Sequence, residues 1–260
     1  MKSSLREDLK WCTEKLLAMH SQAKIGHLGG NLSCLPGLCA VAAQLRPDDR
    51  LILSKGHSAG ALYVTLARHG FIEESELETF HKDDTRLPGH PPANLFPQIP
   101  FATGSLGHGL SLAAGFAYSQ KLRQTENQIY CLTSDGEWQE GSTWEALIFA
   151  VHNRLTNLTI LVDHNGLQGF GSTREVASMD PLWERIRGFD IETEVIDGHD
   201  VDLIASRIHE RAPRLRILFL KTIKGKGVAE FEGRVKSHYL PITDAQFELA
   251  MNEAREKTLS

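Results

Sequence analysis

The amino-acid sequence predicts an α/β protein in which a parallel sheet is covered by helices on both faces. Three observations support this class. From residue 129 onward, short apolar runs alternate with longer segments whose apolar residues recur at helical spacing. The apolar runs are unbroken, which is typical of strands buried on both faces. No linker or internal repeat interrupts the 260 residues, so we expect a single domain spanning 1–260.

The first half of the chain has mainly helical patterns. Apolar residues recur at helical spacing between Leu5 and Met19, which predicts an amphipathic helix. We expect further helices at 32–45, 58–68 and 107–122, and a short strand at 51–53. The segment 87–100 contains five prolines and is expected to be an irregular, stiff loop.

The second half alternates regularly. Strands are expected at 129–133, 158–162, 191–196 and 217–220, and helices at 139–155 and 201–210. Near the end, Thr243 and Gln246 have the spacing of a capping box, which predicts the start of a last helix.

Composition excludes several classes of function. A formal charge of −5 and a pI near 6.2 argue against a nucleic-acid-binding surface, which needs a basic stripe. No apolar run is long enough to cross a membrane, and the first residues do not resemble a signal peptide. The four cysteines lack C-x-x-C spacing, so we expect buried thiols in a reducing cytoplasm.

Polar residues follow two of the expected strands. Asp135 and Gly136 come directly after the first strand of the alternating half, and Asn165 follows the next. Because ligands bind at the carboxyl ends of parallel strands, we expect Asp135 and Asn165 to be neighbours. A carboxylate, an amide oxygen and a turn carbonyl suit Mg²⁺ or Ca²⁺, with phosphates and water filling the other positions. The alternative is that Asp135 caps a helix and Asn165 makes a turn.

Histidines follow glycine unusually often. Gly-His occurs five times, more often than 22 glycines and 12 histidines would give by chance in 260 residues. Glycine allows a close approach to the backbone, and imidazoles can bind sugar hydroxyls and transfer protons. A transition-metal site is a weaker alternative because H-x-x-H and C-x-x-C spacings are missing, and for any single histidine a packing or surface role remains open.

With these motifs, the sequence resembles the thiamine-diphosphate enzymes of the transketolase type. The resemblance extends over nearly the whole chain and rests on these stretches in order: AKIGHLGGNLS, SKGHSAGALY, LPGHPP, ATGSLGHGLS, SDGEWQEGSTWEA, DHNG and KTIKGKGV followed by SHY. It implies a diphosphate-binding domain, called the PP domain, of the thiamine-diphosphate-binding fold.

The resemblance also implies roles for individual residues. Asp135, Asn165 and the carbonyl of Leu167 would hold Mg²⁺ or Ca²⁺ against the cofactor's diphosphate, and Gly136 would let the diphosphate approach the backbone. His57 and His238 match histidines that contact the diphosphate.

Other matched residues face the rest of the cofactor, the substrate or a second subunit. Gly104, Ser105 and Leu106 would lie beside the aminopyrimidine ring. The catalytic histidines would be His27 and His90, which face the substrate, together with His238. Glu140 and Glu145 match acids at a subunit interface, although a solvated helix start explains them equally well.

The sequence departs from the family pattern at several positions. Ser134 replaces the first glycine of G-D-G, Ile25 and Leu28 replace a serine and a proline around His27, and His108 replaces a glutamine. These changes concern substrate preference more than cofactor binding.

Transketolases usually have three domains, and this chain resembles only the first. The resemblance therefore implies the N-terminal subunit of a split transketolase, active with a second chain that carries the pyrimidine-binding domain and its glutamate. Self-association into an α₂β₂ assembly is expected, as is transfer of a two-carbon glycolaldehyde unit from a ketose (phosphate) donor to an aldose (phosphate) acceptor. Three alternatives stay open: a deoxyxylulose-phosphate-synthase-like protein, the α-subunit of a 2-oxo-acid dehydrogenase, and a cofactor-binding subunit without catalysis.

Overall fold

Five parallel strands form one sheet at the centre of the molecule. The computed structural model describes residues 3–256. In spatial order the strands are β1 (Arg50–Leu53), β2 (Ile129–Ser134), β3 (Leu158–His164), β5 (Leu215–Lys221) and β4 (Ile191–Asp197). All neighbouring pairs are parallel, which confirms the predicted sheet.

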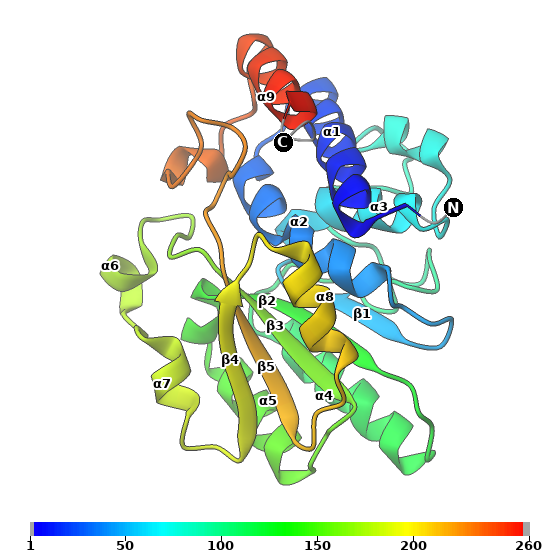
Figure 1. Cartoon of the computed structure of the whole chain (residues 1–260), viewed down its shortest axis with the longest axis vertical. Coiled ribbons are helices and arrows are strands. Elements are labelled where there is room, and N and C mark those ends of the chain that lie inside the picture. The colour runs from blue at the N-terminus through cyan, green and yellow to red at the C-terminus, as the bar shows by residue number, and fades with distance from the viewer. Residues whose placement is uncertain (1–2, 257–260) are drawn as a thin grey trace.

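Helices cover both faces of this sheet, as the unbroken apolar strands predict. One face carries α1 (Leu5–Ala23), α2 (Leu28–Ala42), α3 (Ala59–Arg68), α8 (Val201–His209) and α9 (Asp244–Glu256), which pack into one hydrophobic core. The other face carries α4 (His108–Leu122), α5 (Gly141–His152) and the short α7 (Leu182–Ile186), which pack into a second core. Figure 1 shows α8 over the first face and α4 and α5 on the other.

The alternation of side chains along each strand divides the two cores. In β1, Leu51 and Leu53 belong to the first core, whereas Ile52 belongs to the second. Because successive side chains point to opposite faces, a strand must be apolar at every position to be buried on both sides.

Parallel register brings the carboxyl ends of the strands to one edge. Ser134 of β2 is paired with Asp163 of β3, so the residues that follow each strand emerge side by side. Three one-turn 3₁₀ helices continue from this edge or lie near it: η1 (Gly56–Ser58) after β1, η3 (Gly136–Gln139) after β2 and η4 (Val235–His238). Another, η2 (Glu74–Thr79), follows α3.

Several predicted boundaries were wrong. Helix α2 begins at Leu28 rather than residue 32, although Gly29 and Gly30 occupy its first turn. The whole helix is buried, and a Cβ on Gly29 would lie 2.2 Å from Ser237 Oγ, so close packing outweighs the poor helix propensity of glycine. Helix α5 begins at Gly141 rather than residue 139 because Gln139 belongs to η3. The short helices α6 (Thr173–Ala177) and α7 were not predicted, since five residues carry little periodic signal.

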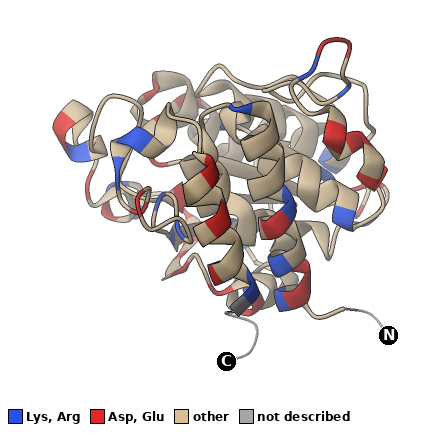
Figure 2. Cartoon of the chain, turned by 90° about the horizontal axis from the view of Figure 1, so that it is seen from above, with Lys and Arg blue, Asp and Glu red and all other residues tan. Residues whose placement is uncertain are grey.

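Surface and interior agree with the composition. Figure 2 shows, in its view from above, Lys and Arg interspersed with Asp and Glu on the helices. Cys12, Cys34, Cys39 and Cys131 are all buried and unpaired, as predicted. Within residues 3–256, no helix combines the length and the apolar character that crossing a bilayer would require.

Candidate functional site

The carboxyl edge of the sheet gathers most of the residues singled out from the sequence. His57 follows β1, Asp135 follows β2 and Asn165 follows β3. The loop after β5 adds Lys224, and η4 ends with His238. Residues far apart in the chain therefore meet at one place, because parallel strands end on the same side.

The oxygens of Asp135 and Asn165 belong to one tight turn system. Asp135 Oδ1 accepts from Gly136 N at 2.8 Å and its Oδ2 accepts from Gly166 N at 2.6 Å. Asn165 Oδ1 accepts from Leu167 N at 3.0 Å. Asp135 therefore caps the helix η3 and Asn165 makes a turn, as the alternative expected. The two residues are also neighbours, as predicted, because Asp135 accepts from the residue that follows Asn165. Burial raises the pKa of Asp135, so a nearby cation would favour its ionised form.

These oxygens suit a hard cation. A carboxylate oxygen and an amide oxygen each have more than one acceptor position, so one hydrogen bond per atom leaves room for a metal. Across residues 3–256, no group of three or more His, Cys, Asp and Glu side chains is arranged to hold a metal ion. A site here would therefore depend on Asn165 and on a backbone carbonyl, which are ligands typical of Mg²⁺ and Ca²⁺.

Three histidines form a cluster beside this turn system. The ring centroid of His27 lies 5.5 Å from that of His57 and 4.8 Å from that of His238, and the last two are 5.3 Å apart. His27 N donates to the carbonyl of His238 at 2.8 Å, which ties η4 to the start of α2. Burial lowers the pKa of all three imidazoles, and that of His238 falls to about 3. The cluster is therefore neutral at neutral pH.

His27 is held in an unusual state. Its backbone has φ 65°, in the left-handed region that non-glycine residues seldom adopt. Its Nδ1 is buried and has no hydrogen-bond partner. Backbone strain and an unpaired buried nitrogen at one residue are features of binding and catalytic positions.

Lys224 lies between the turn that contains Leu167 and the histidine cluster. Its Nζ lies 3.1 Å from the carbonyl oxygen of Leu167 and 3.2 Å from His238 Nδ1, and the side chain is almost completely buried. An ammonium group can only donate, so Nδ1 of neutral His238 accepts and its Nε2 carries the proton. Burial, together with the charge of Lys55, lowers the pKa of Lys224 to about 8.

A buried ion pair supports the same turn. Lys55 and Asp163 both have fully buried side chains, with Nζ and Oδ2 separated by 2.5 Å. The Asp163 carboxylate also accepts from Ser33, Asn165 and Thr222. Burial alone would lower the pKa of Lys55 and raise that of Asp163, but their mutual attraction outweighs it and keeps both charged. The bond from Asn165 Nδ2 to Asp163 fixes the orientation of that amide, so that its Oδ1 accepts from Leu167 N and keeps one further acceptor position.

Sequence patterns do not identify Lys55, Asp163 or Lys224 as site residues. Charged side chains are common next to turns and are usually solvated. The available signal is that Lys55 and Asp163 lie at or near the ends of strongly apolar runs, where burying a charge is costly unless it is paired.

His90 lies between two cavities. One, of about 620 Å³, is lined by His90, Gly104, Ser105 and His108 among others. The second, of about 260 Å³, is lined by His27, His57 and His90. Gly104 has φ 154°, and a Cβ there would lie 2.8 Å from His90 Cδ2, so glycine permits this contact. The segment 104–106 and the histidine cluster are thereby connected.

The two acids predicted to lie at a subunit interface, Glu140 and Glu145, are exposed at the start of α5. Glu140 precedes α5 and packs against Gly107, where an added Cβ would come within 2.7 Å of Glu140 Cβ. Glu145 is exposed further along α5.

Comparisons with known proteins agree on one family. Residues 39–255 match the model of the transketolase, thiamine diphosphate binding domain. The 6-deoxy-6-sulfo-D-fructose transketolase subunit of Clostridium sp. (strain MSTE9) is 37% identical over 247 residues, which cover 90% of each chain. An apulose-4-phosphate transketolase subunit from Actinobacillus succinogenes is 33% identical over 97% of this chain and 96% of its own.

A solved structure gives the same result. Transketolase from Campylobacter jejuni superimposes with a TM-score of 0.87 at 27% sequence identity over 98% of this chain. The chain spans 43% of that transketolase, whereas it spans nearly all of the two relatives named as subunits.

Proposed function

Because this chain belongs to the transketolase family and carries its thiamine diphosphate binding domain, we propose that it is the N-terminal subunit of a split transketolase. With a second chain, it would transfer a two-carbon glycolaldehyde unit from a ketose (phosphate) to an aldose (phosphate). The observation that carries the proposal is the position of Lys224, whose Nζ contacts both the Leu167 carbonyl and Nδ1 of His238.

The cofactor would be held through a divalent cation. Asp135, Asn165 and the carbonyl of Leu167 would bind Mg²⁺ or Ca²⁺, and the cation would bind the diphosphate. Their remaining acceptor positions support this assignment, as does the raised pKa of Asp135, because a bound cation offsets the cost of a buried carboxylate. Gly136, which has no side chain to obstruct the approach, and His57 would lie against the diphosphate.

Lys224 adds a positive charge where a diphosphate needs one. It already contacts the Leu167 carbonyl, so a cation at that oxygen would leave the ammonium free to face phosphate oxygens. Gly104, Ser105 and Leu106 would lie beside the aminopyrimidine ring.

Thiamine diphosphate supplies the electron sink for breaking a carbon–carbon bond beside a carbonyl. The chain's own residues would bind the sugar and move protons. His27 and His90 are neutral and can accept a proton from a sugar hydroxyl, and the unpaired Nδ1 of His27 is available as a hydrogen-bond partner. His238, protonated on Nε2, would donate a hydrogen bond to a carbonyl or phosphate oxygen.

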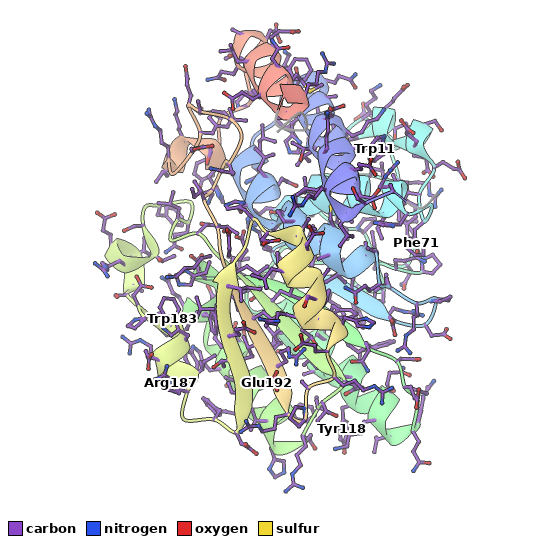
Figure 3. All side chains as sticks on the ribbon, viewed as in Figure 1. Trp11, Phe71, Tyr118, Trp183, Arg187 and Glu192 are labelled. Carbon is purple, nitrogen blue, oxygen red and sulfur yellow. The ribbon has the colours of Figure 1, made fainter. Side chains whose placement is uncertain are left out.

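The partner would be a chain carrying the pyrimidine-binding domain. Two relatives that this chain covers almost end to end are named as transketolase subunits, which supports a divided enzyme. We infer self-association through the face bearing Glu140 and Glu145, giving α₂β₂. Ile148 and Phe149 on the same helix are 55% and 41% exposed, and Phe149 packs on Tyr118 of α4, which is labelled in Figure 3. We place the assembly in the cytoplasm.

The decisive experiment is a coupled ketol-transfer assay on the purified chain, with and without a separately encoded pyrimidine-binding subunit. We expect no turnover by the chain alone and turnover in the mixture, dependent on thiamine diphosphate and MgCl₂. Mass in solution should change from self-associated chain to a complex containing both. Turnover without the partner would contradict the split-subunit proposal, because the glutamate expected on the partner would then have to come from this chain.

A further inference from the structure

Glu137 is a completely buried acid for which the proposed chemistry gives no role. It lies in the acidic stretch after β2, two residues beyond Asp135, and its side chain is 0% exposed. A buried carboxylate is costly unless its oxygens are hydrogen-bonded, so its partners indicate what it does.

The partners of Glu137 come from three separate segments. Oε1 accepts from the Ser54 hydroxyl and, at 2.7 Å, from Gly107 N. Oε2 accepts from Ser134 N at 3.3 Å. Ser54 precedes the Lys55–His57 turn, Gly107 follows the segment 104–106, and Ser134 precedes Asp135. Two of these segments carry residues assigned above to the diphosphate end of the cofactor, and the third carries those assigned to the aminopyrimidine ring.

Glycines bring these segments into contact. Gly107 has φ 87°, and a Cβ on Gly109 would lie 2.1 Å from Ser54 Oγ. The first turn of α4 therefore rests directly on the end of β1, and Glu137 lies where the two meet. The amide of Gly107 is at the start of a helix, where an N–H has no partner within the helix.

We infer that Glu137 is a positioning residue that fixes the segment 104–107 relative to the ends of β1 and β2. It acts through Gly107 N and the Ser54 hydroxyl and does not touch the cofactor itself. The inference rests on the proposed function for its meaning, since segment 104–106 is the one assigned to the aminopyrimidine ring. The position of the segment 104–107 relative to β1 and β2 can, however, be measured on this chain alone, without the cofactor.

Two substitutions separate the contacts. Glu137→Ala removes both acceptor oxygens. Glu137→Gln retains one acceptor oxygen for Gly107 N and the Ser54 hydroxyl, but its amide NH₂ then faces Ser134 N, donor against donor. Glu184→Ala, which removes an exposed glutamate on α7, is the matched control.

The test is amide hydrogen exchange of the purified full-length chain, read by NMR at Gly107, Ser134 and, for comparison, Phe219 in β5. In Glu137→Ala we expect exchange at Gly107 and Ser134 to accelerate on the order of tenfold or more, with Phe219 unchanged. In Glu137→Gln we expect acceleration at Ser134 and protection at Gly107. Glu184→Ala should match wild type at all three.

Two results would overturn the inference. One is Gly107 protection in Glu137→Ala within twofold of wild type. The other is equal acceleration at Phe219, which would mean a loss of global stability. If the alanine variant does not fold, the glutamine variant decides, because a purely structural acid would not give opposite behaviour at Ser134 and Gly107.

Calorimetric titration of thiamine diphosphate with MgCl₂ into the same proteins, in the presence of the partner subunit, tests whether the positioning by Glu137 affects cofactor binding. We expect weaker binding to Glu137→Ala and near wild-type binding to Glu137→Gln. Absence of binding to wild type would count against the proposed function, while the exchange results would still decide the role of Glu137.

Discussion

Replacing Lys55 with methionine tests the buried ion pair beneath the site. Both partners are fully buried, and removing one member of such a pair typically costs about 3–5 kcal/mol because the other charge is left uncompensated. After Lys55→Met, Asp163 still accepts from Ser33 at 2.6 Å, Thr222 at 2.5 Å and Asn165 at 3.1 Å. We therefore expect a loss near the lower end, about 3 kcal/mol.

Replacing the other member of the pair, Asp163, should cause a larger loss in the free energy of unfolding. After Asp163→Ala, the buried ammonium of Lys55 would retain only the carbonyl of Gly30, at 3.0 Å. We expect a loss near the upper end, about 5 kcal/mol. For a chain of this size, about 3 kcal/mol corresponds to a fall in Tm of roughly 6–12 °C.

Thermal unfolding followed by circular dichroism on both variants and on Lys55→Met/Asp163→Leu would measure the difference. The double variant should lose less than the two single losses added together, because it leaves no unpaired charge. Arg214→Met breaks an exposed pair with Asp190 and should cost no more than about 1 kcal/mol. Equal losses in the two single variants, or additive losses in the double variant, would refute this account.

Three further predictions follow from the site and its surroundings. Asp135→Ala should abolish metal-dependent cofactor binding in the reconstituted complex while leaving the circular dichroism spectrum unchanged; unchanged affinity by calorimetric titration would remove Asp135 from the metal site. His27→Ala and His90→Ala should lower turnover about a hundredfold or more with little change in cofactor affinity, and the opposite pattern would exchange their roles. Burial lowers the pKa of His20 to about 4, so the unfolded state binds more protons between about pH 4 and 6.5. The free energy of unfolding should therefore rise with pH across that window by up to about 3 kcal/mol. Urea unfolding at several pH values should give a flatter profile for His20→Gln, and identical profiles would contradict the assignment.

The fold class could be predicted because burial on both faces leaves a simple pattern. β2, β3 and β5 each contain a run of apolar residues, and helices such as α1 and α8 have an apolar stripe. The start of α2 could not be predicted in this way. Its glycines are poor helix formers, and only close packing against other segments, Ser237 at Gly29 and Ser58 at Gly30, explains why they are helical.

The candidate site could be predicted in part for a related reason. Asp135 and Asn165 follow strands directly, so the position of the strands also gives theirs. Glu137, by contrast, differs little in sequence from the exposed Glu140 and Glu145. Its burial depends on Ser54 and Gly107, which come from other segments, and no local pattern records such contacts.

The edges of the sheet affect how copies of this protein can meet. β4 lies at one edge, and an edge strand can be extended by a strand from another molecule, the first step toward fibrous aggregates. Glu192, labelled in Figure 3, and Glu194 place charges along β4, and their partners Arg216 and Arg207 come from β5 and α8. The strand at the other edge, β1, has only four residues. Strand-by-strand growth is therefore disfavoured at both edges, and free copies of this chain are protected from polymerising through the sheet.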